Sequence, residues 1–118
     1  MRFLVLAAEE DSFARWDAMT EAERGVHFEA MERFAEAVQA RGAMVDGGAL
    51  DRPGQVRTVR PGETSSRPVT DGPFAETVEQ LGGFWLVELP DLAAAVEAAK
   101  LLPPSYSVEV RPIIEMSH

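Results

Sequence analysis

Two segments of this chain follow the same order of strand, helix and strand, and this repetition constrains the fold more than any other feature. The predicted elements are strand 2–8, helix 21–41 and strand 43–50 in the first unit, and strand 84–89, helix 92–102 and strand 107–115 in the second. Two fused units of this kind predict one domain over residues 1–118. The expected fold is a ferredoxin-like α+β sandwich, with both helices on one face of an antiparallel sheet.

The ends of the predicted helices carry capping signals. Thr20 and Glu23 have the spacing of a capping box, in which each side chain bonds the backbone amide of the other residue. Gly42 follows the first helix, where a left-handed C-terminal cap favours glycine. Asp91 is the predicted N-cap of the second helix. The expected apolar stripes are Val26, Ala30, Met31, Phe34 and Val38 on the first helix, and Leu92, Ala95, Val96, Ala99 and Leu102 on the second.

A polar, turn-rich segment separates the two units and predicts a small antiparallel ribbon. Its strands are expected over 56–60 and 67–70, and the glycine- and proline-rich stretch between them is the turn. A helical turn is one alternative for residues 75–81. The pair Gly82-Gly83 is predicted as a tight turn, and Gly47-Gly48 as a bulge or a close approach of the backbone.

The first strand is apolar on both faces, which has a consequence for assembly. Phe3, Val5 and Ala7 alternate with Leu4, Leu6 and Ala8, so the face away from the helices is also apolar. A contiguous exposed patch of this kind is unusual for a monomer. We therefore expect a homodimer in which the two sheets lie face to face, since two-fold pairs are the commonest oligomers.

Composition and charge exclude several classes of function. The chain has a net charge of −9, and it therefore lacks the basic surface that nucleic-acid binding needs. The absence of cysteine excludes disulfides, thiol catalysis and thiolate metal sites. The apolar run near the N-terminus ends at Glu9 and is too short to cross a membrane, so a cytoplasmic protein is expected. No phosphate-cradling loop, nucleophile elbow or dinucleotide motif is present, and we expect neither a cofactor nor a metal.

Asp71 is the first candidate for chemistry, because it lies in the densest group of polar side chains. Either its carboxylate caps its own turn, or it acts as a general acid or base. His27, on the first helix, is either a satisfied or solvated side chain or the partner of Asp71 in an acid/base pair. Spacing along the chain does not decide between these alternatives.

Other side chains could complete a ligand site around Asp71. Glu76 and Glu79 share one side if residues 75–81 are helical, and crowded carboxylates raise one another's pKa. Phe74, Trp85 and Arg60 are the further predicted binding residues, although core packing explains Trp85 equally well. Glu88 lies on a predominantly apolar strand, and its expected partner is Arg60 or Arg111.

The residues around Asp71 also carry a family resemblance. The stretch 69–77, which reads VTDGPFAET, and the stretch 79–85, which reads EQLGGFW, resemble the signature of the YCII-related or DGPF-domain proteins. The resemblance extends to the opening strand, to Gly42 and to the closing stretch 109–112. It implies a dimeric α+β barrel fold and a proposed His–Asp pair in a cleft, for which Asp71 matches the acid. Where the family commonly has a lysine, this chain has Val78.

Three functional hypotheses follow. The leading one is a homodimer that binds a small organic molecule in a cleft near Asp71, with cofactor-free general acid/base catalysis. The alternative, implied by the resemblance, is a non-catalytic regulatory module linked to extracytoplasmic-function sigma factors. A third is a structural dimer in which Asp71 only caps a turn.

Overall fold

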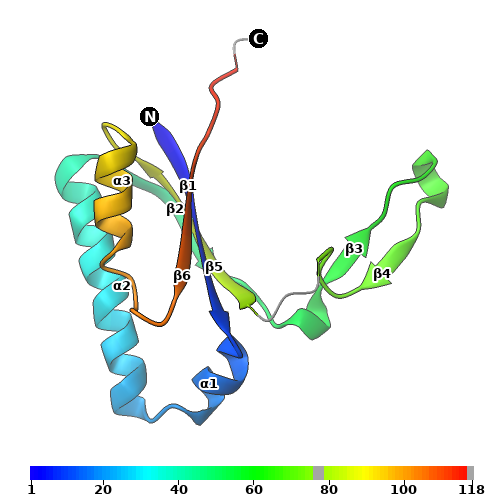
Figure 1. Cartoon of the computed structure of the whole chain (residues 1–118), viewed down its shortest axis with the longest axis horizontal. Coiled ribbons are helices and arrows are strands. Elements are labelled where there is room, and N and C mark those ends of the chain that lie inside the picture. The colour runs from blue at the N-terminus through cyan, green and yellow to red at the C-terminus, as the bar shows by residue number, and fades with distance from the viewer. Residues whose placement is uncertain (76–78, 117–118) are drawn as a thin grey trace.

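The fold is shown by a computed structural model that describes residues 1–75 and 79–116 (Figure 1). Its elements are β1 (Arg2–Glu10), α1 (Ser12–Ala18), α2 (Glu21–Arg41), β2 (Ala43–Ala49), the 3-10 helix η1 (Pro53–Gln55), β3 (Arg57–Val59), the 3-10 helix η2 (Thr64–Ser66), β4 (Val69–Asp71), β5 (Glu79–Glu88), α3 (Leu92–Ala99) and β6 (Ser107–Pro112). Four strands form an antiparallel sheet in the order β2-β5-β1-β6. β3 and β4 form a separate ribbon that projects away from the sheet (Figure 1). The predicted ferredoxin-like α+β class is confirmed.

Both α2 and α3 lie on one face of the sheet, which we call the inner face (Figure 1). Alternation along β1 buries Phe3, Val5 and Ala7 on this face and leaves Leu4 and Leu6 half-buried on the outer face. The core lies between the inner face and the helices, and its largest fully buried side chains are Phe3, Phe34, Val5, Val38 and Val87. The α2 helix therefore crosses the sheet with Phe34 and Val38 as its main anchors.

The α2 helix begins and ends at the predicted residues, and its capping box is confirmed. The amide of Glu23 donates to the Thr20 hydroxyl at 3.2 Å, and the Thr20 amide donates to the Glu23 carboxylate at 3.0 Å. The hydrogen bond from the Thr20 backbone lowers the pKa of Glu23. The predicted left-handed cap at Gly42 is wrong, because its φ of −170° is extended backbone. Glycine is required there for a different reason: a Cβ at Gly42 would overlap the backbone carbonyl oxygen of Glu88.

The predicted apolar stripes are partly wrong. Val26 is 61% exposed, because it lies one turn before Ala30, where the buried face of α2 begins. On α3 the buried residues are alanines, and Leu92 and Val96 face outward. Small side chains allow α3 to approach the sheet closely. The α3 helix also ends at Ala99, earlier than expected, although Leu102 remains buried beyond it.

The strand β5 is longer than the sequence indicates. It already begins at Glu79, so residues 79–81 are strand and not part of a helical turn, residues 76–78 lie outside the described part of the chain, and the predicted tight turn at Gly82-Gly83 is wrong. The reason is that β1 continues to Glu10 and pairs with this stretch, with a register shift opposite Ala7 and Ala8. The predicted close approach at Gly47 is confirmed, since a Cβ there would lie 2.8 Å from the indole of Trp85.

Candidate functional site

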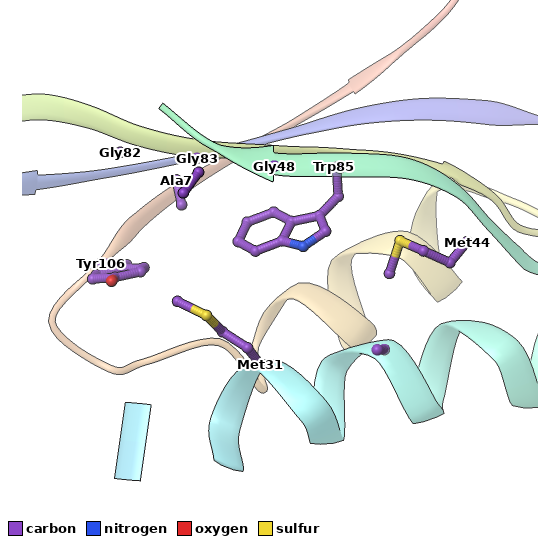
Figure 2. A pocket seen from close by; sticks show the side chains of 11 residues that line it. Ala7, Met31, Met44, Gly48, Gly82, Gly83, Trp85 and Tyr106 are labelled. Atoms are coloured by element: carbon purple, nitrogen blue, oxygen red, sulfur yellow. The ribbon is translucent and has the colours of Figure 1, made fainter. Parts of the chain in front are cut away.

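A pocket of about 380 Å³ lies between the inner face of the sheet and α2. Figure 2 shows Trp85 pointing from β5 toward α2 and Met31 pointing from α2 toward the sheet. Tyr106 lies at one end of the pocket and Met44 at the other (Figure 2). The walls are therefore mainly apolar and aromatic, which is the usual lining of a small-molecule site.

The pocket exists because small residues meet on the inner face at this point. Ala7, Gly47, Ala49 and Gly83 come from three neighbouring strands that the register brings side by side. On α2, Ala35 faces the same space. Elsewhere the inner face carries larger side chains such as Phe3, which fill the gap to the helices.

Trp85 forms the central wall and is held firmly in place. It packs edge-to-face against Phe34, with ring centroids 5.2 Å apart. Gly47, its cross-strand partner, provides the space over which the indole lies. A side chain at Gly47 would displace the indole, whereas a Cβ at Gly83 would meet only ordinary contacts, the nearest at 3.4 Å.

Polar groups gather at the Tyr106 end. The turn before β6 places Tyr106, whose amide donates to the carbonyl oxygen of Pro103 at 3.0 Å. Burial, and then the charge of Glu9, raise the pKa of the Tyr106 phenol, so its hydroxyl is protonated at neutral pH. The His27 ring lies 5.7 Å from the Tyr106 ring, between centroids. Its Nε2 is buried and has no hydrogen-bond partner among residues 1–75 and 79–116.

Asp71 lies elsewhere, at the end of β4 in the ribbon. Its side chain is 90% exposed and forms an ion pair with Arg57 at 3.2 Å. Figure 1 shows the ribbon and α2, which carries His27, on opposite sides of the main sheet. One chain therefore does not bring His27 and Asp71 together, and their acid/base pairing stays a prediction that would need a second chain.

The other predicted binding residues are divided between the two regions. In the ribbon, Arg60 donates to the Thr70 hydroxyl at 3.2 Å and to the Phe74 carbonyl at 3.1 Å, while the Phe74 side chain is 79% exposed. Glu79, on β5, accepts a hydrogen bond from the Ser107 hydroxyl at 2.9 Å. Glu76 and Val78 lie outside the described residues. Of the predicted set, Trp85 is the residue that lines the pocket.

The predicted partners of Glu88 are wrong. Glu88 pairs with Arg2, its cross-strand neighbour on β1, at 3.7 Å. Arg111 instead pairs with Glu109 at 3.0 Å. Cross-strand register, which spacing along the chain does not show, decides this pairing.

Sequence reasoning missed Glu9 and Tyr106. Glu9 was assigned to the end of the first apolar run, yet it continues the buried alternation of Phe3, Val5 and Ala7 and is only 4% exposed. One more step of the period-2 pattern would have placed it on the inner face. Tyr106 carries no such signal, because it lies in an irregular turn.

Comparison with known proteins agrees with this fold. The family model described as YCII-related domain matches residues 1–117. The chain belongs to this YCII-related family. It is also similar to an uncharacterised protein of Rhizobium meliloti (strain 1021), with 49% identity over 49 residues. That match covers 38% of this chain and 40% of the length of the relative.

The described part of this YCII-related chain has neither a candidate metal centre nor a helix suited to a membrane. Within residues 1–75 and 79–116, no group of three or more His, Cys, Asp or Glu side chains is arranged to hold a metal ion. In the same part of the chain, no helix has the length and apolar character needed to cross a membrane.

Proposed function

We propose that this YCII-related protein binds a small organic molecule in the pocket between α2 and the sheet. The observation that carries the proposal is a space of about 380 Å³ that is lined by Trp85, Met31, Met44 and Tyr106. Its volume lies within the range of ligand sites, about 300–1,000 Å³. The space is open to solvent on one side, so a ligand can enter it without unfolding the core.

The proposed test is to fill the pocket from the helix side. In Ala35→Leu, a larger side chain enters the pocket from α2, and leucine favours the helix. Fragments that bind the wild-type protein in ligand-observed NMR should lose binding in this variant. Ala40→Leu is the matched control, since Ala40 is exposed on the same helix. Fragments that bind Ala35→Leu as well as the wild type would refute the proposal.

A homodimer through the outer face of the sheet is the second part of the proposal. The outer face carries apolar side chains that neither α2 nor α3 covers, namely Leu4, Leu6, Ala8, Leu81, Phe84 and Leu86. Arg2 and Glu88 form an ion pair at one end of this patch, and Glu109 and Arg111 lie beside it. An apolar centre with a charged rim is the usual anatomy of a protein interface.

The dimer is testable by one substitution. Leu6→Glu would place two carboxylates in a face-to-face interface, one from each chain, and each would lie beside Glu109, the cross-strand partner of Leu6. We expect the mass in solution to fall from about twice 12.9 kDa to 12.9 kDa, measured by light scattering after gel filtration. A wild-type protein that is monomeric at micromolar concentration would refute this part of the proposal.

General acid/base catalysis at Asp71 and the link to sigma factors stay predictions. The Asp71 carboxylate, 90% exposed and paired with Arg57, has the setting of an ordinary surface ion pair. The pocket supports ligand binding more directly than the ribbon does, because it encloses space and the ribbon residues are exposed.

A further inference from the structure

Glu9 is the most unusual ionisable residue in the described part of the chain. It lies on the inner face of β1, two residues beyond Ala7, which lines the pocket. Its relative exposure is only 4%, so this charged residue is buried. Glutamate is almost never buried to this extent unless it is paired.

No partner for Glu9 is present within residues 1–75 and 79–116. Its carboxylate takes part in no hydrogen bond and no ion pair there, and the ion pairs of the main sheet join Arg2 to Glu88 and Arg111 to Glu109. Its charge does act on Tyr106, the polar residue of the pocket lining. Glu9 follows Ala8, and Tyr106 precedes Ser107, the cross-strand partner of Ala8, so the strand register places Glu9 at the Tyr106 end of the pocket.

We propose that the pocket binds an organic amine, with its ammonium group beside Glu9 and Tyr106 and its apolar body between Trp85 and Met31. This inference rests on the proposed function, because it names the class of ligand for the same pocket. The occupant is a small, protonated primary amine that carries an aromatic or aliphatic group.

The hydrogen-bonding groups at this end match an ammonium group. A primary ammonium has three donors and no acceptor. The Glu9 carboxylate and the Tyr106 hydroxyl oxygen both accept hydrogen bonds. The Nε2 of His27 is a buried nitrogen without a partner in the described residues, and it accepts a hydrogen bond in the tautomer that carries the proton on Nδ1. The acceptors of Glu9 and Tyr106 thus match the donors of an ammonium group at this end of the pocket, and the His27 ring lies next to Tyr106.

The surroundings also favour a cation over an anion. The rings of His27 and Tyr106 pack edge-on, 5.7 Å apart between centroids, and Tyr106 and Trp85 supply aromatic side chains to the pocket wall. Cations are attracted to the faces of aromatic rings. The net charge of −9 raises the local concentration of cations. A ligand carboxylate in the same position would face the Glu9 carboxylate with no cation between them.

The experiment compares three probes of similar shape and different charge. These are 2-phenylethylamine, 2-phenylethanol and 3-phenylpropionate, titrated into the wild-type protein and followed by ligand-observed NMR. We expect the amine to bind more tightly than the alcohol by at least about tenfold, the scale of one hydrogen bond to a charged group. The carboxylate should bind more weakly than the alcohol.

Two variants locate the preference. Glu9→Gln keeps the shape of the side chain and should remove the preference for the amine. Glu10→Gln is the matched control, because it removes the same charge from the exposed neighbouring residue and should preserve the preference. Loss of the preference in both variants would overturn the inference, since general acidity would then explain it.

The outcomes separate this inference from the proposed function. If the three probes bind the wild-type protein with equal affinity, the amine inference is overturned while ligand binding in the pocket stands. If none of the probes binds at millimolar concentration, the result counts against both. An amine preference that disappears in Glu9→Gln alone supports both.

Discussion

Removing the Glu9 carboxylate should stabilise the free protein. In Glu9→Met, a side chain of similar length without charge occupies a site that is 4% exposed and borders the apolar pocket. Ionised groups in such sites destabilise a fold unless they are paired, and no hydrogen bond or ion pair of Glu9 exists among the described residues. Residues that serve a ligand site often carry such a penalty when the ligand is absent.

The size of the effect can be worked out from two contributions. The terminal methyl group of methionine buries apolar surface where glutamate has its carboxylate, which contributes about 0.8 kcal/mol. For comparison, replacing a buried ion pair by apolar residues of similar volume often stabilises a protein by about 1–4 kcal/mol. Because the carboxylate oxygens are not fully enclosed, we expect a total gain near the lower limit, about 1–2 kcal/mol.

Urea denaturation at neutral pH, followed by circular dichroism, measures this gain as a higher midpoint with an unchanged slope. A gain of 1 kcal/mol corresponds to a rise in Tm of about 4 °C for a domain of this size. Glu10→Met is the control and should change the free energy of unfolding by no more than about 0.5 kcal/mol. A loss of stability in Glu9→Met at constant slope would show that the carboxylate is held by structural interactions, and the argument for an unpaired ligand-binding charge would fail.

Three further predictions concern the helices and the ribbon. Gly25→Ala should raise the free energy of unfolding by about 0.5–1 kcal/mol in urea titrations, since alanine favours a helix and no atom lies within 4 Å of the added Cβ; no gain would contradict this reasoning. Because the pKa of Glu23 is lowered in the folded state, ionised Glu23 stabilises the fold above its unfolded pKa, and this stabilisation is lost as the pH falls through its folded pKa. The difference in Tm between wild type and Glu23→Gln should therefore shrink from pH 7 to pH 3. An equal difference at both pH values would count against the capping box. Asp71→Asn should change stability by less than about 0.5 kcal/mol and leave probe binding in the pocket unaltered, because its ion pair is exposed; weaker binding in calorimetry would instead connect the ribbon to the site.

Much of the fold could be predicted because it depends on local patterns. The spacing of Thr20 and Glu23 locates the start of α2, and the alternation along β1 separates an inner from an outer face. Both signals use residues that are close in sequence. The longer β5 was missed because its first residues are stabilised by pairing with β1, about 70 positions earlier in the chain.

The pocket could not be predicted for a related reason. Its floor depends on the register that brings Ala7, Gly83 and Ala49 side by side, and no local pattern shows that three small residues from three strands will be neighbours. Asp71 attracted attention because polar residues are dense around it, but such density is also typical of an exposed turn. The buried Glu9 was less conspicuous, although its burial distinguishes it chemically from the exposed carboxylates.

The small residues that create the pocket also make its dimensions easy to change. At Gly83 and Ala35, each added carbon would reduce the space for a ligand while leaving strand pairing and helix capping intact. Gly47 cannot be enlarged in the same way, because the indole of Trp85 already occupies the space beside it. Members of one family could thus diverge in the size of the molecule they accept through single substitutions at two positions, while the ionic end at Glu9 stays the same.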